Sequence, residues 1–120
     1  MDNMTRLERI VAELPEAQRV DVVEWDHPTF RVRGKNFIFC DARADHFSVK
    51  LPREEAEAVL ATDRTASPTG YGLGRHGWVD ISVPPGADTG HWEQVREWVR
   101  TSYTLIAPKK LARLVAEPAD

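Results

Sequence analysis

The sequence predicts an α+β fold, in which helices pack on one face of a single antiparallel sheet. Three observations support this prediction. Apolar residues recur at helical spacing near both ends of the chain. The segments between them alternate apolar and polar residues and are separated by turn-forming residues, as in short antiparallel strands. One further helical segment, opened by Pro52, interrupts this series of strands.

The first helix is expected at residues 4–14, where apolar and charged residues alternate with a helical period. Thr5 and Glu8 have the spacing of a capping box, and Asn3 is an alternative cap. Pro15 interrupts the helix, and residues 16–19 are open to one further turn.

Period-two alternation predicts the strands. They are expected at residues 20–25, 29–33, 37–40, 46–51 and 78–83. The sequence 26-DHP-28 suggests a turn, and Gly34, Lys35 and Asn36 are expected to form the turn of a β-hairpin. Residues 66–78 are rich in turn formers and are predicted to be a loop.

Three helices are expected in the rest of the chain. The helix opened by Pro52 is expected to bury Ala56, Val59 and Leu60. A long helix, capped by Asp88 or Thr89, carries a buried stripe of Trp92, Val95, Val99, Tyr103 and Ile106. A short last helix begins at Pro108 and is expected to bury Leu111, Leu114 and Val115, with a frayed tail at 116–120.

Trp98 lies off the apolar stripe of the long helix and allows two interpretations. An exposed Trp could anchor a protein partner. Alternatively, the helix is buried over a wide arc and Trp98 belongs to the core, which is the interpretation we favour.

Length and composition predict one globular domain, residues 1–120, of 13.6 kDa. The net charge of −3 argues against coating nucleic acid by bulk charge, so the 16 basic residues would have to gather on one face. Cys40 is the only cysteine, which excludes an internal disulfide. With neither a signal peptide nor an apolar run of membrane-spanning length, the sequence predicts a cytoplasmic protein without a membrane partner, and we favour a monomer.

Basic residues gather in two places. In 30-FRVRGKNFIFC-40, Arg31 and Arg33 are expected to point away from Phe30 and Val32, with Lys35 at the turn and Lys50 on the same outer face. Lys109, Lys110 and Arg113 form a second group near the C-terminus. Such cations can neutralise phosphates without reading bases. On the residues alone, a solvated sheet face and a solvated helix face are the favoured interpretations.

No pattern predicts catalysis, a metal site or a cofactor. The glycines of 70-GYGLG-74 precede an expected strand, whereas a nucleotide loop needs a helix there. The four histidines are scattered, so a shared site requires convergence in space, for which His27 and His76 are the candidates. No serine has the setting of a nucleophile elbow.

Taken together, the sequence resembles the MmcQ/YjbR family of small bacterial proteins. The resemblance covers about residues 22–114, and its carriers are 27-HPTFRVRGKNF-37, 47-FSVKLP-52, the segment 68–71 followed by 77-GWVDISV-83, and 98-WVRTSYTLIAPKKL-111. It implies a frataxin-like (CyaY-like) sandwich and the family's usual description as DNA-binding. Because the family has no established contact residues, the basic residues above are our assignment from the matching positions.

The expected function is therefore weak, sequence-tolerant and non-enzymatic DNA binding. The alternative is a protein-interaction module with an unidentified partner, which predicts an exposed apolar patch around Trp98 or Tyr71. Iron handling, by analogy with frataxin, ranks lower because Arg6 and Arg9 interrupt the acids of the first helix.

Overall fold

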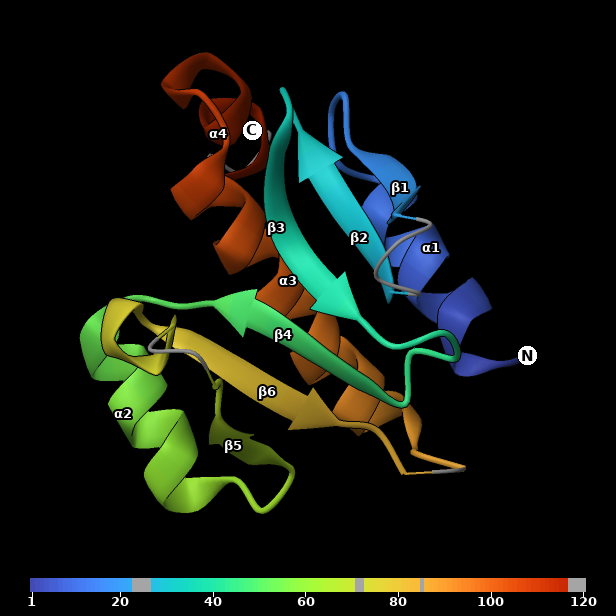
Figure 1. Ribbon diagram of the computed structural model, residues 1–120, viewed down its shortest axis with the longest axis vertical. Coiled ribbons are helices and arrows are strands. Elements are labelled where there is room, and N and C mark those ends of the chain that lie inside the picture. The colour runs from blue at the N-terminus through green and yellow to red at the C-terminus, as the bar shows by residue number, and fades with distance from the viewer. Residues whose placement is uncertain (23–26, 71–72, 85, 117–120) are drawn as a thin grey trace.

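The computed structural model describes residues 1–22, 27–70, 73–84 and 86–116, which form one antiparallel sheet and the helices around it (Figure 1). The strand order across the sheet is β1-β2-β3-β4-β6-β5. The strands are β1 (Gln18–Val22), β2 (His27–Val32), β3 (Lys35–Cys40), β4 (His46–Lys50), β5 (Ala66–Pro68) and β6 (Trp78–Ser82). The helices are α1 (Asn3–Ala12), α2 (Arg53–Thr62), the short 3-10 helix η1 (Leu73–His76), α3 (Thr89–Ile106) and α4 (Lys109–Ala116). The predicted α+β fold is confirmed.

Helices α1 and α3 pack on one face of the sheet. In Figure 1, α1 and α3 lie behind the sheet, while α2 lies at its β5–β6 edge. The covered face buries a row of apolar side chains against them: Phe30, Ile38, Phe47, Val49, Val79 and Ile81. Burial of this apolar surface is the main stabilising contribution to the fold. The opposite face, called the open face below, carries the alternate residues of the same strands.

The start and end of α1 differ from the prediction. Asp2 is the N-cap, and its carboxylate accepts a hydrogen bond from the Thr5 backbone N–H at 2.8 Å, so neither Thr5 nor Asn3 caps the helix. The helix ends at Ala12, and the chain enters β1 at Gln18 without a further helical turn. The hydroxyl of Tyr103 donates to the Pro15 carbonyl at 2.7 Å, which ties this connection to α3.

The hairpin turn is one position earlier than expected. Arg33 and Gly34 form it, with φ of 51° and 79°, and Lys35 already belongs to β3. Positive φ at both central residues is the geometry of a type I′ turn, whose twist matches the flanking strands. Arg33 therefore leaves the alternation of β2, and the prediction of a turn at residues 34–36 was wrong.

A β-bulge interrupts β3 at Phe37. Phe30 pairs with Ile38 but Arg31 pairs with Asn36, which leaves Phe37 as the extra residue. The Phe37 ring lies against Tyr103 of α3, edge to face, with centroids 5.5 Å apart.

Residues 66–78, predicted to be a loop, contain β5 and η1. β5 pairs with β6 and forms one edge of the sheet. Gly77 connects η1 to β6 with a φ of 90°, and a Cβ there would collide with the carbonyl oxygen of Leu51. Its own carbonyl accepts the Leu51 N–H at 2.9 Å, so the two segments run in direct backbone contact.

The C-terminal helices follow the prediction with one exception. Asp88 caps α3 by accepting the His91 backbone N–H at 2.9 Å. Trp98 is only 3% exposed, which confirms the wide buried arc. Leu114, in contrast, is 68% exposed and does not belong to the core. No helix among the described residues is both long and apolar enough to span a membrane.

Some predictions concern residues that the structure does not describe. The end of the first predicted strand at Trp25, the start of the turn at Asp26, Tyr71 and the tail at 117–120 lie outside the described residues.

Candidate nucleic-acid interface

Arg31 and Lys50 share the open face, as predicted. Thr29 pairs with Phe39, which pairs with Ser48, so these three lie on one face of the sheet. Arg31 follows Thr29 by two residues and Lys50 follows Ser48 by two, which places both cations on that face. The Arg31 Nε–H donates to the side-chain oxygen of Asn36 at 2.6 Å, across the hairpin.

Arg33 and Lys35 are placed differently from Arg31. Arg33 lies in the turn, and its guanidinium donates to both carboxylate oxygens of Glu16, at 2.7 and 2.9 Å. Lys35 pairs with the buried Val32 and therefore lies on the side of the sheet that carries the helices. Arg33 is therefore not part of the strand alternation that predicted a common direction with Arg31, although both residues line one hollow.

The second basic group lies next to this turn. Lys109, Lys110 and Arg113 are exposed on α4, which Figure 1 shows beside the turn end of β3. The Arg33 hydrogen bond is the main cause that lowers the pKa of Glu16, and the charge of Lys110 lowers it further. Lys110 is therefore close enough to act on the same carboxylate as Arg33, although the two residues are far apart in the sequence.

We call the end of the molecule that carries these cations the basic end, although they do not all lie on one face of the sheet. Its members are Arg31, Arg33, Lys35, Lys109, Lys110 and Arg113. Arg31 and Arg33 also line a hollow of about 270 Å³ together with Glu16 and Gln18. Lys50 lies apart from it, on the open face, where its position in β4 is opposite Trp78 in β6.

The Arg33–Glu16 pair leaves the Arg33 guanidinium available to an anion. Its side chains are 57% and 48% exposed, and pairs in such solvent contact are worth little free energy. A phosphate group can therefore compete with Glu16 for Arg33 at a small cost. The arrangement can bind phosphate, and it supplies no group positioned to read bases.

A second hollow, of about 350 Å³, lies on the open face. Four of its lining residues, Thr29, Phe39, Ser48 and Asp80, belong to one row of directly paired residues that crosses the sheet. The hydroxyls of Ser48 and Thr69 both donate to Oδ1 of Asp80, the latter at 2.9 Å. The ring of Phe39 lies 5.2 Å, centroid to centroid, from that of the buried Trp78.

Phe39, Ser48 and Asp80 were not predicted as site residues. Alternation alone indicates that each faces away from the helices, but it does not give the register that aligns them. The register depends on the bulge at Phe37 and on the insertion of α2 and β5 between β4 and β6, which leave no local signal in the sequence.

His27 and His76, the two candidates for a shared site, do not line the same hollow. His27 and His46 line the open-face hollow, whereas His76 is exposed in η1. Nδ1 of His46 lies 3.0 Å from the hydroxyl oxygen of Ser82. Among the described residues, no three His, Cys, Asp or Glu side chains form a group that could hold a metal ion.

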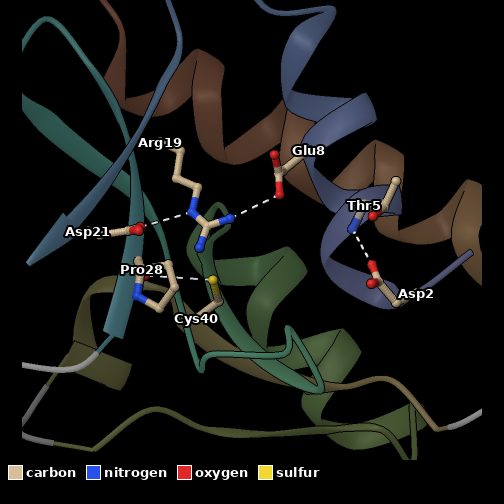
Figure 2. A network of polar contacts seen from close by, with 7 residues as sticks. All are labelled: Asp2, Thr5, Glu8, Arg19, Asp21, Pro28 and Cys40. Carbon is tan, nitrogen blue, oxygen red and sulfur yellow. Dashed lines mark hydrogen bonds and ion pairs between the residues drawn. The ribbon is translucent and has the colours of Figure 1, made fainter.

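The acids of α1 and the following residue are paired with arginines. Arg19 of β1 reaches Glu8 at 3.0 Å and Asp21 at 2.9 Å, as Figure 2 shows. Arg96 of α3 reaches Glu13 at 2.6 Å. These pairs join α1 to the sheet and to α3, and they divide the acidic ridge that an iron site would need.

The thiol of Cys40 is buried, and Figure 2 shows it beside Pro28. Its sulfur lies 3.6 Å from the carbonyl oxygen of Pro28, and burial is the main cause that raises the pKa of Cys40 to about 12. Both effects disfavour the thiolate, which is the form of cysteine that acts as a nucleophile or metal ligand.

The chain was compared with known proteins. A family model described as YjbR matches residues 12–105. The structure is similar to the crystal structure of the Deinococcus radiodurans protein DR2400, which contains a DUF419 domain. The TM-score is 0.74 at 21% sequence identity, with 98% of this chain and 91% of that one covered, a likeness that concerns the fold alone. No curated protein matches the chain. The frataxin-like relationship stays a prediction.

Proposed function

The chain belongs to the YjbR family, and we propose that it is a non-enzymatic DNA-binding protein whose basic end contacts the phosphate backbone. The observation that carries this proposal is that a cation from each basic group acts on Glu16. Arg33 donates two hydrogen bonds to this carboxylate, and Lys110 lowers its pKa from the neighbouring helix.

A surface of this kind favours weak and sequence-tolerant binding. Its cations, all exposed except the half-buried Arg31, are lysines and arginines, which neutralise phosphates but carry no sequence information. Glu16 lowers the local positive potential, and the whole chain carries a net charge of −3. Binding is therefore expected to weaken steeply as salt rises, because it depends on the release of counterions.

The alternative, a protein-interaction module, loses one of its two predicted anchors. Trp98 is buried and cannot form an exposed hot spot. Tyr71 lies outside the described residues. A protein partner is therefore the interpretation left if DNA does not bind.

Fluorescence anisotropy with labelled duplex and single-stranded DNA, at about 50 mM and 200 mM salt, tests the proposal. Two double variants, Arg31→Ala/Arg33→Ala and Lys109→Ala/Lys110→Ala, remove cations from the two halves of the basic end. Each is expected to weaken binding and to reduce the slope of log K against log salt by nearly one unit per lost phosphate contact. Arg53→Ala/Arg64→Ala removes two exposed arginines near α2 and serves as the matched control.

Glu16→Gln provides a test in the opposite direction. It removes the carboxylate between Arg33 and Lys110, so binding is expected to tighten, whereas Glu57→Gln on α2 has no such effect. The proposal fails if no DNA binds at low salt, or if the basic-end variants behave like their controls.

A further inference from the structure

We propose that the open-face hollow holds one unpaired nucleobase of single-stranded DNA, packed against Phe39 and hydrogen bonded to Asp80. This inference rests on the proposed function and names the form of nucleic acid that the chain prefers. A base inside a duplex has its hydrogen-bonding edge paired and its faces stacked, so the hollow can take only an unpaired base.

The size and lining of the hollow suit a base. Its volume of about 350 Å³ lies at the small end of the range for ligand pockets. Phe39 supplies an aromatic wall that Trp78 supports from the side. Stacking on an aromatic side chain is the usual way in which proteins hold single-stranded bases, including on the open faces of sheets.

Asp80 supplies a fixed acceptor at the other side of the hollow. Ser48 and Thr69 both donate to its Oδ1 atom, which holds the carboxylate in place. Asp80 and Phe39 are in the same row but two strands apart, a separation of about 10 Å. A base that lies over Ser48 between them can offer an amino group to Asp80, as cytosine N4 does to carboxylates.

The charges on the open face fit a nucleotide rather than an isolated base. Arg31 and Lys50 are each two residues beyond the row, about 7 Å along their strands, and lie on the same face. They are placed to reach the phosphates that flank the bound base. Arg31 also lines the hollow of the basic end, so the two surfaces are continuous through this residue.

The experiment compares labelled oligo-dC, oligo-dT and a duplex by anisotropy, using the full chain. Thymine has no exocyclic amino group, so we expect oligo-dC to bind more tightly than oligo-dT and both to bind more tightly than the duplex. Phe39→Leu keeps apolar volume but removes the aromatic face, and is expected to weaken single-strand binding by about five-fold or more. Asp80→Asn keeps the shape and is expected to abolish the preference for dC over dT.

Two variants control for size and charge. Leu105→Ala removes an exposed apolar side chain from α3, and Glu57→Gln neutralises an exposed acid on α2. Neither is expected to change the ratio of single-strand to duplex affinity. Thermal melts establish that Phe39→Leu and Asp80→Asn are folded, and the base preference of Asp80→Asn does not depend on the amount of folded protein.

The outcomes separate this inference from the proposed function. Equal affinity for single strands and duplex, unchanged in Phe39→Leu and Asp80→Asn, would overturn the base site and leave the basic end intact. If free dCMP binds as tightly as oligo-dC, the ligand is a mononucleotide, and the claim that the hollow prefers single-stranded DNA is overturned. Absence of binding to every nucleic acid would overturn both.

Discussion

The buried hydroxyl of Ser102 in α3 donates to the carbonyl of Phe37, at 2.6 Å, where β3 bulges. The same oxygen accepts the backbone N–H of Lys50, at 2.9 Å. The bulge disturbs the ladder at this point, and Ser102 supplies the partner that both strands need. One side chain of the helix layer therefore holds the end of the sheet next to the hairpin.

Ser102→Ala removes a single oxygen atom, yet it should be strongly destabilising. It leaves a buried carbonyl and a buried N–H without their partner, each at a cost of about 1–3 kcal/mol. We expect the free energy of unfolding in urea to fall by about 2–4 kcal/mol. Thr104→Ala is the control, because the Thr104 hydroxyl donates to the Thr101 carbonyl within its own helix. If the free energy of unfolding falls equally in the two variants, the hydrogen bonds of Ser102 to the two strands stabilise the fold no more than an ordinary helix hydroxyl does.

Gly77→Ala should also destabilise the fold. The φ of 90° is strained for any residue with a Cβ, and the added carbon meets the Leu51 carbonyl. We expect a loss of about 2 kcal/mol or more, measured as a shift in the urea midpoint. Gly70→Ala, in the same connection but with open space around its Cβ position, should cost much less. A midpoint unchanged in Gly77→Ala would mean that the backbone there relaxes freely.

The sequence predicts most of this fold because its signals are local. The stripe of α3 and the alternation of β4 and β6 each follow from the residues of one segment. β5 was missed because its three residues lie among turn formers, and only their pairing with β6 makes them a strand. The sequence was enough to single out the basic residues of the candidate site, but not to predict how they are distributed over the surface. That depends on the type I′ turn at Arg33 and on the packing of α4, neither of which leaves a local pattern.

Glu16 is expected to titrate below its ordinary pKa of 4.5, because the Arg33 hydrogen bond favours the carboxylate. Arg33→Gln should move that pKa back up, as measured by the NMR titration of the Glu16 side chain. Because the folded-state pKa is depressed, this pair stabilises the fold above the ordinary pKa and loses its effect as pH falls through the folded value. The stability difference between wild type and Arg33→Gln should therefore shrink in acid. A Glu16 pKa that does not respond to the substitution would contradict the contact.

Cys40 should resist thiol reagents in the native state. With a pKa of about 12, its thiolate fraction at pH 8 is about 10⁻⁴, roughly a thousand-fold below that of a thiol at 9.0. Because burial raises this pKa, the unfolded chain ionises first, and stability should decline as pH rises above 9.0. Labelling should proceed only on unfolding and follow the denaturation curve in urea. Rapid labelling without denaturant would contradict the buried environment.

The most direct test of the account is an NMR titration of the ¹⁵N-labelled chain with a short DNA oligonucleotide at low salt. If the two basic groups act as one surface, amide shifts should move together at residues 31–35, at Glu16 and at residues 109–113, and raised salt should reverse them. Shifts confined to α2 and the β5–β6 edge, or no shifts with any oligonucleotide, would contradict the claim that this end of the molecule binds DNA.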